Sequence, residues 1–150
     1  MGAHVEYLKK VLTHKWYVFL ECCKLGIPWL GITHDLSKFS PREWRAYAIN
    51  FCVEWEERPQ WVEDMFSTAW NHHQKRNLHH PEYWVCMSRG TPDKVLPMPD
   101  RYRREMLADW RGAGRAYVGW DNTKEWYLNN RDSLRLHPET RAWIEEQLGI

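Results

Sequence analysis

The chain has 150 residues, a length that suggests one domain with one core. A formal net charge of +1 provides no strong signal for nucleic acid, and four cysteines without a C-x-x-C pair argue against a zinc ribbon. No apolar run approaches membrane length and no signal segment is evident, so we expect a cytoplasmic protein without a membrane partner. The oligomeric state stays open.

Apolar residues recur at spacings of three and four along most of the chain, which predicts helices nearly throughout. No alternating pattern predicts a strand. The expected helices run from the N-terminus to about Gly26 and over residues 29–36, 41–57, 59–77 and 100–117, with further starts at Pro81 and Pro138 and a loop over 88–98. The predicted fold class is therefore all-α, a single compact domain over residues 1–150 with about six to eight helices.

The first helix carries two adjacent apolar stripes. One contains Val5, Leu8, Leu12, Trp16, Phe19 and Cys23, and the other contains Tyr7, Val11, His14 and Val18. His14 is therefore expected within a broad apolar face. A histidine in such a place is more often a hydrogen-bonded core residue than a ligand.

Ser40-Pro41-Arg42-Glu43 predicts a helix start. Serine can cap the helix, proline fits its first turn, and Glu43 can reach back to the capping residue.

Asp109 lies on an apolar helix face with Tyr102, Met106 and Ala113. A buried carboxylate without a partner is very costly, so Asp109 needs a cation, a metal or several donors. The alternative without a functional role is a salt bridge to Arg103 or Arg104.

His34-Asp35 follows a short hydrophobic stretch, and such a pair can bind one ion from two sides, although an aspartate at a helix end also caps turns. Six of the eight histidines occur in an order that could surround a metal, namely His14, His34, His72, His73, His79 and His80. Neutral imidazole and carboxylate suit a divalent transition metal such as Mn, Fe, Co, Ni or Zn.

The order His14, His34-Asp35 within "GITHDLSKFS", and Asp109 resembles the HD-domain superfamily of metal-dependent phosphohydrolases over roughly residues 5–117. The whole chain also resembles a small uncharacterised family of bacteriophage and bacterial proteins. The segments "AWNHHQKRNLHHPEYW", "MLADWRGAGRAY" and "LHPETRAWIEEQLGI" carry that second resemblance. For a phage protein, the expected location is the host cytoplasm.

The superfamily resemblance implies an HD-like helical fold and one or two metal ions. It implies that His14, His34, Asp35 and Asp109 bind the first ion. His72 and His73 would bind a second ion, with Asp35 bridging, although Gln74 stands where some members carry an acidic residue. In such a centre one ion activates water and the other holds a phosphoryl oxygen.

The remaining polar residues of this region have candidate roles beside the metal. We assign catalytic roles to Asp35, Lys38 and His80, the last as a proton donor or phosphate contact unless it merely precedes a helix start. The candidates for substrate binding are Lys38, Arg76, Asn77, His79 and Arg111. Which of His72, His73, His79 and His80 reach the metal stays open.

The first hypothesis for function is a metal-dependent phosphohydrolase acting on a nucleotide or other small phosphate ester, a substrate class that the resemblance implies. The second is a phage-encoded binding protein that uses a structural metal site and acts on a host protein or a nucleotide signal. The third is a di-iron oxygenase with the same helical arrangement. Ligand types alone do not decide between these because they tolerate several metals.

Overall fold

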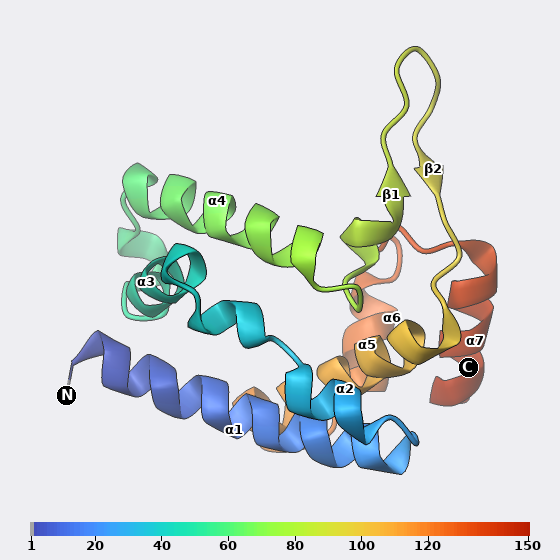
Figure 1. Ribbon diagram of the computed structural model, residues 1–150, viewed down its shortest axis with the longest axis horizontal. Helices are drawn as coiled ribbons and strands as arrows, with labels where there is room; N and C mark the ends of the chain where they lie inside the picture. Colours follow the sequence, from blue (N-terminus) through green and yellow to red (C-terminus); the bar gives the residue numbers. More distant parts are fainter. Residues whose placement is uncertain (1) are drawn as a thin grey trace.

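Helices account for most of residues 2–150, the part of the chain that the computed structural model describes (Figure 1). The α-helices are α1 (Ala3–Lys24), α2 (Pro28–Thr33), α3 (Pro41–Asn50), α4 (Gln60–Arg76), α5 (Asp100–Ala113), α6 (Thr123–Asn130) and α7 (Pro138–Leu148). Three 3₁₀ turns, η1 (Leu36–Phe39), η2 (Trp55–Glu57) and η3 (Pro81–Trp84), and one π turn, η4 (Gly114–Val118), connect them. The all-α prediction is confirmed.

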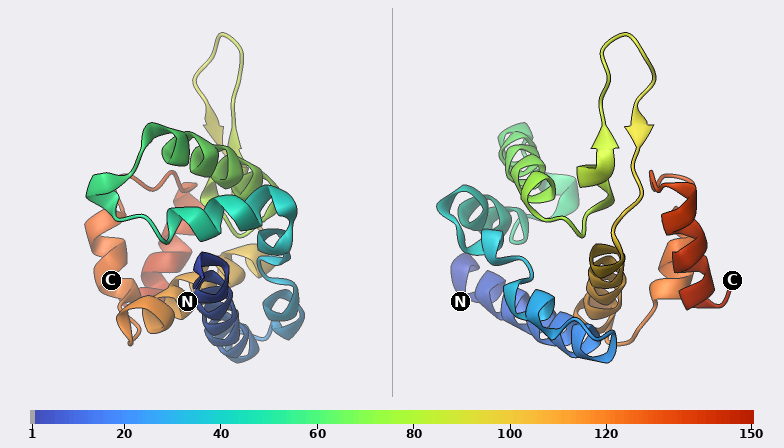
Figure 2. Two further views of the ribbon diagram at one scale, coloured as in Figure 1. Left: turned by 90° about the vertical axis from the view of Figure 1, so that its left-hand side faces the viewer. Right: turned by 45° about the vertical axis from the view of Figure 1, so that its right-hand side comes forward.

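A small hairpin interrupts the helical pattern, although no alternating pattern in the sequence predicts a strand. Strand β1 (Val85–Cys86) pairs antiparallel with β2 (Lys94–Val95), with Val85 opposite Val95. Two residues per strand are too few to produce a visible alternation. The hairpin projects away from the helices in both views of Figure 2.

Two predicted helices are shorter than the sequence pattern indicated. Helix α3 ends at Asn50, and residues 51–57 form turns and η2. Glu54, Glu56 and Glu57 would place negative charge at the C-terminal end of a longer helix, where the helix dipole disfavours it. The second predicted helix is also divided, because α2 stops at Thr33 and the chain turns sharply at Asp35.

The helices pack in two groups that meet along α1. Helix α1 packs against α2 and α5, and α3 packs against α4 and α1. One hydrophobic cluster joins Tyr7 and Val11 to α3 and α4, and another joins α5 to α6 and α7 around Met106, Tyr127 and Ile144. The polar residues described below lie between these two clusters.

Helix α1 buries only one of its two apolar stripes. Tyr7, Val11, His14 and Val18 are buried, as predicted for His14, whereas Val5, Leu8, Leu12 and Trp16 are exposed. Gly112 of α5 lies against this buried face, and a Cβ atom there would stand 2.5 Å from Val18 Cγ2. The close approach of α5 brings Asp109 to His14.

No helix within residues 2–150 combines the length and the apolar character needed to span a bilayer.

Candidate metal centre

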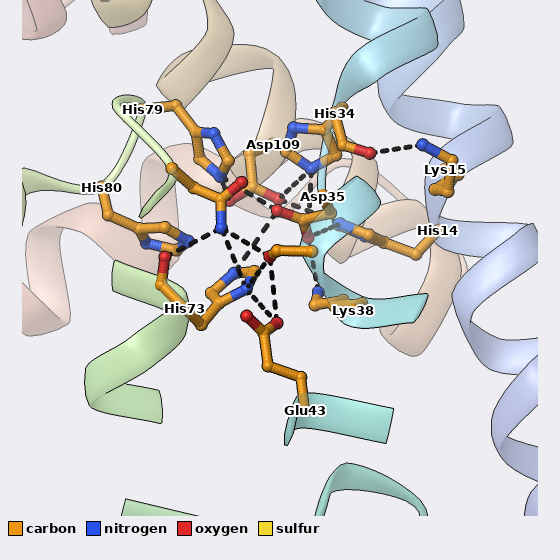
Figure 3. A network of polar contacts seen from close by, with 12 residues as sticks. His14, Lys15, His34, Asp35, Lys38, Glu43, His73, His79, His80 and Asp109 are labelled. Atoms are coloured by element: carbon orange, nitrogen blue, oxygen red, sulfur yellow. Dashed lines mark hydrogen bonds and ion pairs between the residues drawn. The ribbon is translucent and has the colours of Figure 1, made fainter. Parts of the chain in front are cut away.

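Helix α1 contributes His14, and helix α5 contributes Asp109, to a buried polar cluster (Figure 3). His14 Nε2 lies 3.0 Å from Asp109 Oδ1, and the His14 side chain is nearly inaccessible. Asp109 makes no pair with Arg103 or Arg104, because both arginines bind Asp100. The alternative for Asp109, a salt bridge to these arginines, is therefore wrong.

The His34-Asp35 turn contributes two more residues from the end of α2. Asp35 adopts a left-handed conformation with φ of 55°, the only positive φ at a non-glycine residue among residues 2–150. Such a conformation costs energy, although less for aspartate than for most residues, and strained residues of this kind cluster at functional sites. The turn brings His34 Nε2 to 3.4 Å from both Asp35 Oδ2 and Asp109 Oδ1. Lys15 donates a hydrogen bond to the His34 carbonyl and holds the turn against α1.

Three further histidines come from the end of α4 and the segment that follows it. The Nε2 atoms of His73 and His79 lie 3.3 and 3.4 Å from Asp35 Oδ1. The ring of His80 lies beside both, with centroids 4.7 Å from His73 and 4.3 Å from His79. Asp35 is therefore the residue on which histidines from three separate segments converge.

Ligand atoms in this cluster form three overlapping groups within 4.8 Å among the described residues. One group is His14, His34 and Asp35, another is His34, His79 and Asp109, and the third is Asp35, His73, His79 and His80. Two of them share Asp35. The donor set of imidazole nitrogen and carboxylate oxygen is that of sites for transition metals.

Several of these atoms are buried without a hydrogen bond of regular geometry, namely His14 Nε2, His34 Nε2, Asp35 Oδ1, His79 Nε2 and His80 Nε2, and the contacts they do make are to other members of the cluster. Buried polar atoms are nearly always satisfied in folded proteins, so such a concentration requires an explanation. A cation bound among them would satisfy the lone pairs together. The residues present thus fit a metal ion.

Two glutamates orient the histidines from behind. Glu105 Oε1 lies 3.0 Å from His34 Nδ1 and 3.2 Å from His79 Nδ1, and Glu43 Oε2 lies 2.8 Å from His73 Nδ1. With a proton on each Nδ1, these rings donate to the carboxylates and direct the Nε2 lone pairs inwards. Metal-binding histidines commonly have such carboxylate partners.

Charge and burial act in opposite directions on the carboxylates of the cluster. Burial alone would raise the pKa of Asp35, but the neighbouring His34 and Lys38 charges hold it well below its ordinary value. Burial alone would also raise the pKa of Asp109. Hydrogen bonds from His14 and His34 outweigh this effect and hold the pKa well below its ordinary value. Both groups are therefore anionic and able to bind a cation.

The histidines differ in protonation. Burial lowers the pKa of His14 and, together with the charge of His79, lowers that of His80 well below its ordinary value, so both rings are neutral. Burial disfavours the charged form of His79 as well, but hydrogen bonds to Asp35 and Glu105 raise its pKa to about 10. A neutral imidazole is the form that binds a metal, so an ion bound by His79 would replace the proton that its Nε2 otherwise directs towards Asp35.

The structure brings together most, but not all, of the residues that the sequence singled out. His14, His34, Asp35, His73 and Asp109 lie in the cluster, and so do His79 and His80, for which we predicted roles with substrate. His72 lies outside the metal groups and contacts Glu43 Oε1 at 2.7 Å. Residues three and four apart share a helix face, so adjacent His72 and His73 point differently from α4.

The predicted substrate-binding residues do not all lie at the cluster. Lys38 lies inside, with Nζ 2.5 Å from Asp35 Oδ2, and Asn77 donates to Ser37 and to the His73 carbonyl. Arg76 lines a pocket next to the cluster. Arg111 lies 3.8 Å from buried Glu21 and 3.7 Å from Asp121, so its charge is directed away from the histidines.

Sequence reasoning missed Glu43 and Glu105. Glu43 was assigned to a helix start, yet Ser40 makes no side-chain capping bond and Glu43 contacts His72, His73 and Ser37 instead. Glu105 precedes Asp109 by four residues, so a second carboxylate on that helix face was the available signal.

The chain belongs to DUF5662, a family of unknown function, which matches residues 3–150. Neither curated proteins nor solved structures provide a match to the chain.

Proposed function

We propose that this protein is a metal-dependent phosphohydrolase of the HD type that acts on a nucleotide or another small phosphate ester. The observation that carries the proposal is the convergence of buried imidazole nitrogens and carboxylate oxygens around Asp35. The order of the converging residues in the chain, His14, His34-Asp35 and Asp109, supports the HD assignment. The ligand set fits one or two ions of Mn, Fe, Co, Ni or Zn.

Bound divalent ions would supply an activated water and would stabilise the negative charge that develops on a phosphoryl group. His14, His34, Asp35 and Asp109 would hold one ion. His73, His79 and His80 would hold another, with Asp35 contributing to both. This places His72 outside the ligand set and moves His79 and His80 into it.

The chain's own residues prepare the centre for this chemistry. Glu105 and Glu43 fix the orientation of the imidazole rings through hydrogen bonds. Lys38 remains charged beside Asp35: burial opposes the charge, but the Asp35 carboxylate raises the pKa of the ammonium above its ordinary value. A fixed cation of this kind is suited to holding a phosphate oxygen.

A two-iron centre that activates O₂ is the second candidate, because two of the ligand groups share a carboxylate. Four or five histidines with two aspartates suit iron as well as other metals. A binding protein with a structural metal is the third, and it predicts a bound ion without any turnover.

The first experiment is elemental analysis of the purified protein, compared with the double variant His34→Ala/Asp35→Ala. We expect one or two equivalents of a divalent transition metal in the wild type and none in the variant. The matched control is His137→Ala/Asp132→Ala, which removes the same residue types at positions outside the cluster. Circular dichroism of all three proteins shows whether they are helical.

Metal-loaded protein is then assayed for phosphate release from a panel of nucleotides and p-nitrophenyl phosphate, with Asp35→Asn as the inactive reference. Absence of metal in the wild type after reconstitution would overturn the proposal. Retention of metal without phosphate release favours the binding protein. Two equivalents of iron with O₂ consumption favour the oxygenase.

A further inference from the structure

A pocket of about 680 Å³ lies beside the histidine cluster, between the start of α3 and the end of α4. Its size falls within the range of sites for small molecules. The polar residues among those that line it are Thr33, Ser37, Ser40, Arg42, His72, Arg76 and Asn77. No acidic residue lines it, so the pocket is cationic.

Arg42 and Arg76 provide that charge from two different helices. Neither has an ion-pair or hydrogen-bond partner among the described residues. Several other arginines behave differently, since Arg103, Arg104 and Arg115 each bind a carboxylate at 2.7 to 2.9 Å. Two guanidinium groups that line one pocket without counterions form a favourable environment for an anion.

The first residues of α3 add to this environment. Ser40, Pro41 and Arg42 all line the pocket, so the positive end of the α3 dipole faces it. Ser40 Oγ is buried without a hydrogen-bond partner and is free to donate. The absent capping bond, unusual for a serine at this position, leaves that hydroxyl available.

One layer of side chains separates the pocket from the metal centre. Glu43 contacts His72 of the pocket wall at 2.7 Å and His73 of the cluster at 2.8 Å. Asn77 and Ser37 line the pocket and also lie 3.1 and 3.2 Å from His73 Nδ1. A ligand in the pocket would therefore contact the residues that position His73.

We propose that this pocket binds a phosphate group, with Arg42 and Arg76 as its cationic partners and His72 and Ser40 as hydrogen-bonding groups. The site lies outside the metal ligands and its binding of an anion does not require the metal. The phosphate belongs either to the substrate, as a group other than the one hydrolysed, or to a separate phosphorylated molecule.

Calorimetric titration of the metal-free protein with inorganic pyrophosphate tests the site. We expect saturable binding that Arg42→Ala and Arg76→Ala each weaken by about tenfold, as for loss of one charge-assisted contact. Arg45→Ala is the matched control, because Arg45 is exposed on the same helix and does not line the pocket. Equal weakening by all three variants, or no saturable binding, would overturn the proposal.

Metal content is measured in the same variants, so that a failure of this proposal is distinguishable from a failure of the proposed function. Normal metal content with no pyrophosphate binding refutes only the pocket. In the metal-loaded protein, one equivalent bound more tightly than to the metal-free protein assigns the pocket to the substrate. Two equivalents, one with the metal-free affinity and still sensitive to Arg42→Ala, assign it to a separate molecule.

Discussion

Replacement of Glu105 by glutamine is expected to weaken metal binding while leaving every proposed ligand in place. One carboxylate oxygen of Glu105 accepts from both His34 and His79, at 3.0 and 3.2 Å, and the residue is 5% exposed. A hydrogen bond to a charged group contributes about 1.5–3 kcal/mol and a neutral one about 0.5–1.5 kcal/mol. Loss of the charge across two bonds therefore costs about 2–3 kcal/mol.

That cost corresponds to a loss of metal affinity of roughly 30- to 150-fold, which overlaps the range of about 10- to 100-fold typical of residues that support ligands. Competition against a chelator of known affinity, with Zn or Mn at fixed pH, measures it. Glu63→Gln, an exposed residue of α4, is the control. Because Glu105 contacts histidines of all three ligand groups, Glu105→Gln should weaken the binding of every ion. Glu43→Gln should weaken only the binding of an ion held by His73.

The reasoning would be refuted by a Glu105→Gln protein that is folded and binds every ion within about twofold of wild-type affinity. Such a result would mean that the Glu105 hydrogen bonds do not control the orientation of the imidazole rings.

Three further changes test other parts of the structure. Gly112→Ala places a Cβ 2.5 Å from Val18 Cγ2 and 2.8 Å from the Val18 backbone nitrogen. We therefore expect the free energy of unfolding to fall by about 1–2 kcal/mol. Unchanged stability in urea would contradict the close contact between α1 and α5. His72→Ala should retain all metal found in the wild type, whereas His73→Ala should lose an ion, and the reverse order by elemental analysis would show that the wrong histidine was chosen. Burial raises the pKa of the Cys22 thiol to about 12. A nitrobenzoate disulfide reagent at neutral pH should therefore label Cys23, Cys52 and Cys86 in the folded protein, and Cys22 only after unfolding. Rapid labelling of all four cysteines would show that Cys22 is not buried.

The local sequence pattern was sufficient to predict the helices in which the spacing of apolar residues continues over several turns. The start of α3 at Pro41 and the extent of α4 were predicted within a residue or two, because proline and the spacing of apolar residues act locally. The end of α3 and the hairpin were not predicted. Charge near a helix end and a pairing of two residues per strand produce only weak local signals.

The choice between two adjacent stripes on α1 required the tertiary structure. Both stripes are apolar, and only the approach of α5, allowed by Gly112, shows that the stripe with His14 is buried and the one with Trp16 is exposed. The same limit applies to adjacent His72 and His73, since helical periodicity does not say which one faces the core when both neighbouring faces are partly apolar.

The sequence by itself determined the all-helical class and the residues His14, His34, Asp35 and Asp109 as one candidate centre, because these signals depend on residue type and order. Only the tertiary structure decided which histidines after α4 join them and that Glu43 and Glu105 support the rings. Those decisions depend on contacts between residues 26–71 positions apart in the chain, such as His79 with Glu105 and His34 with Glu105. Distances across the fold are set by how the helices pack together, which no local pattern encodes.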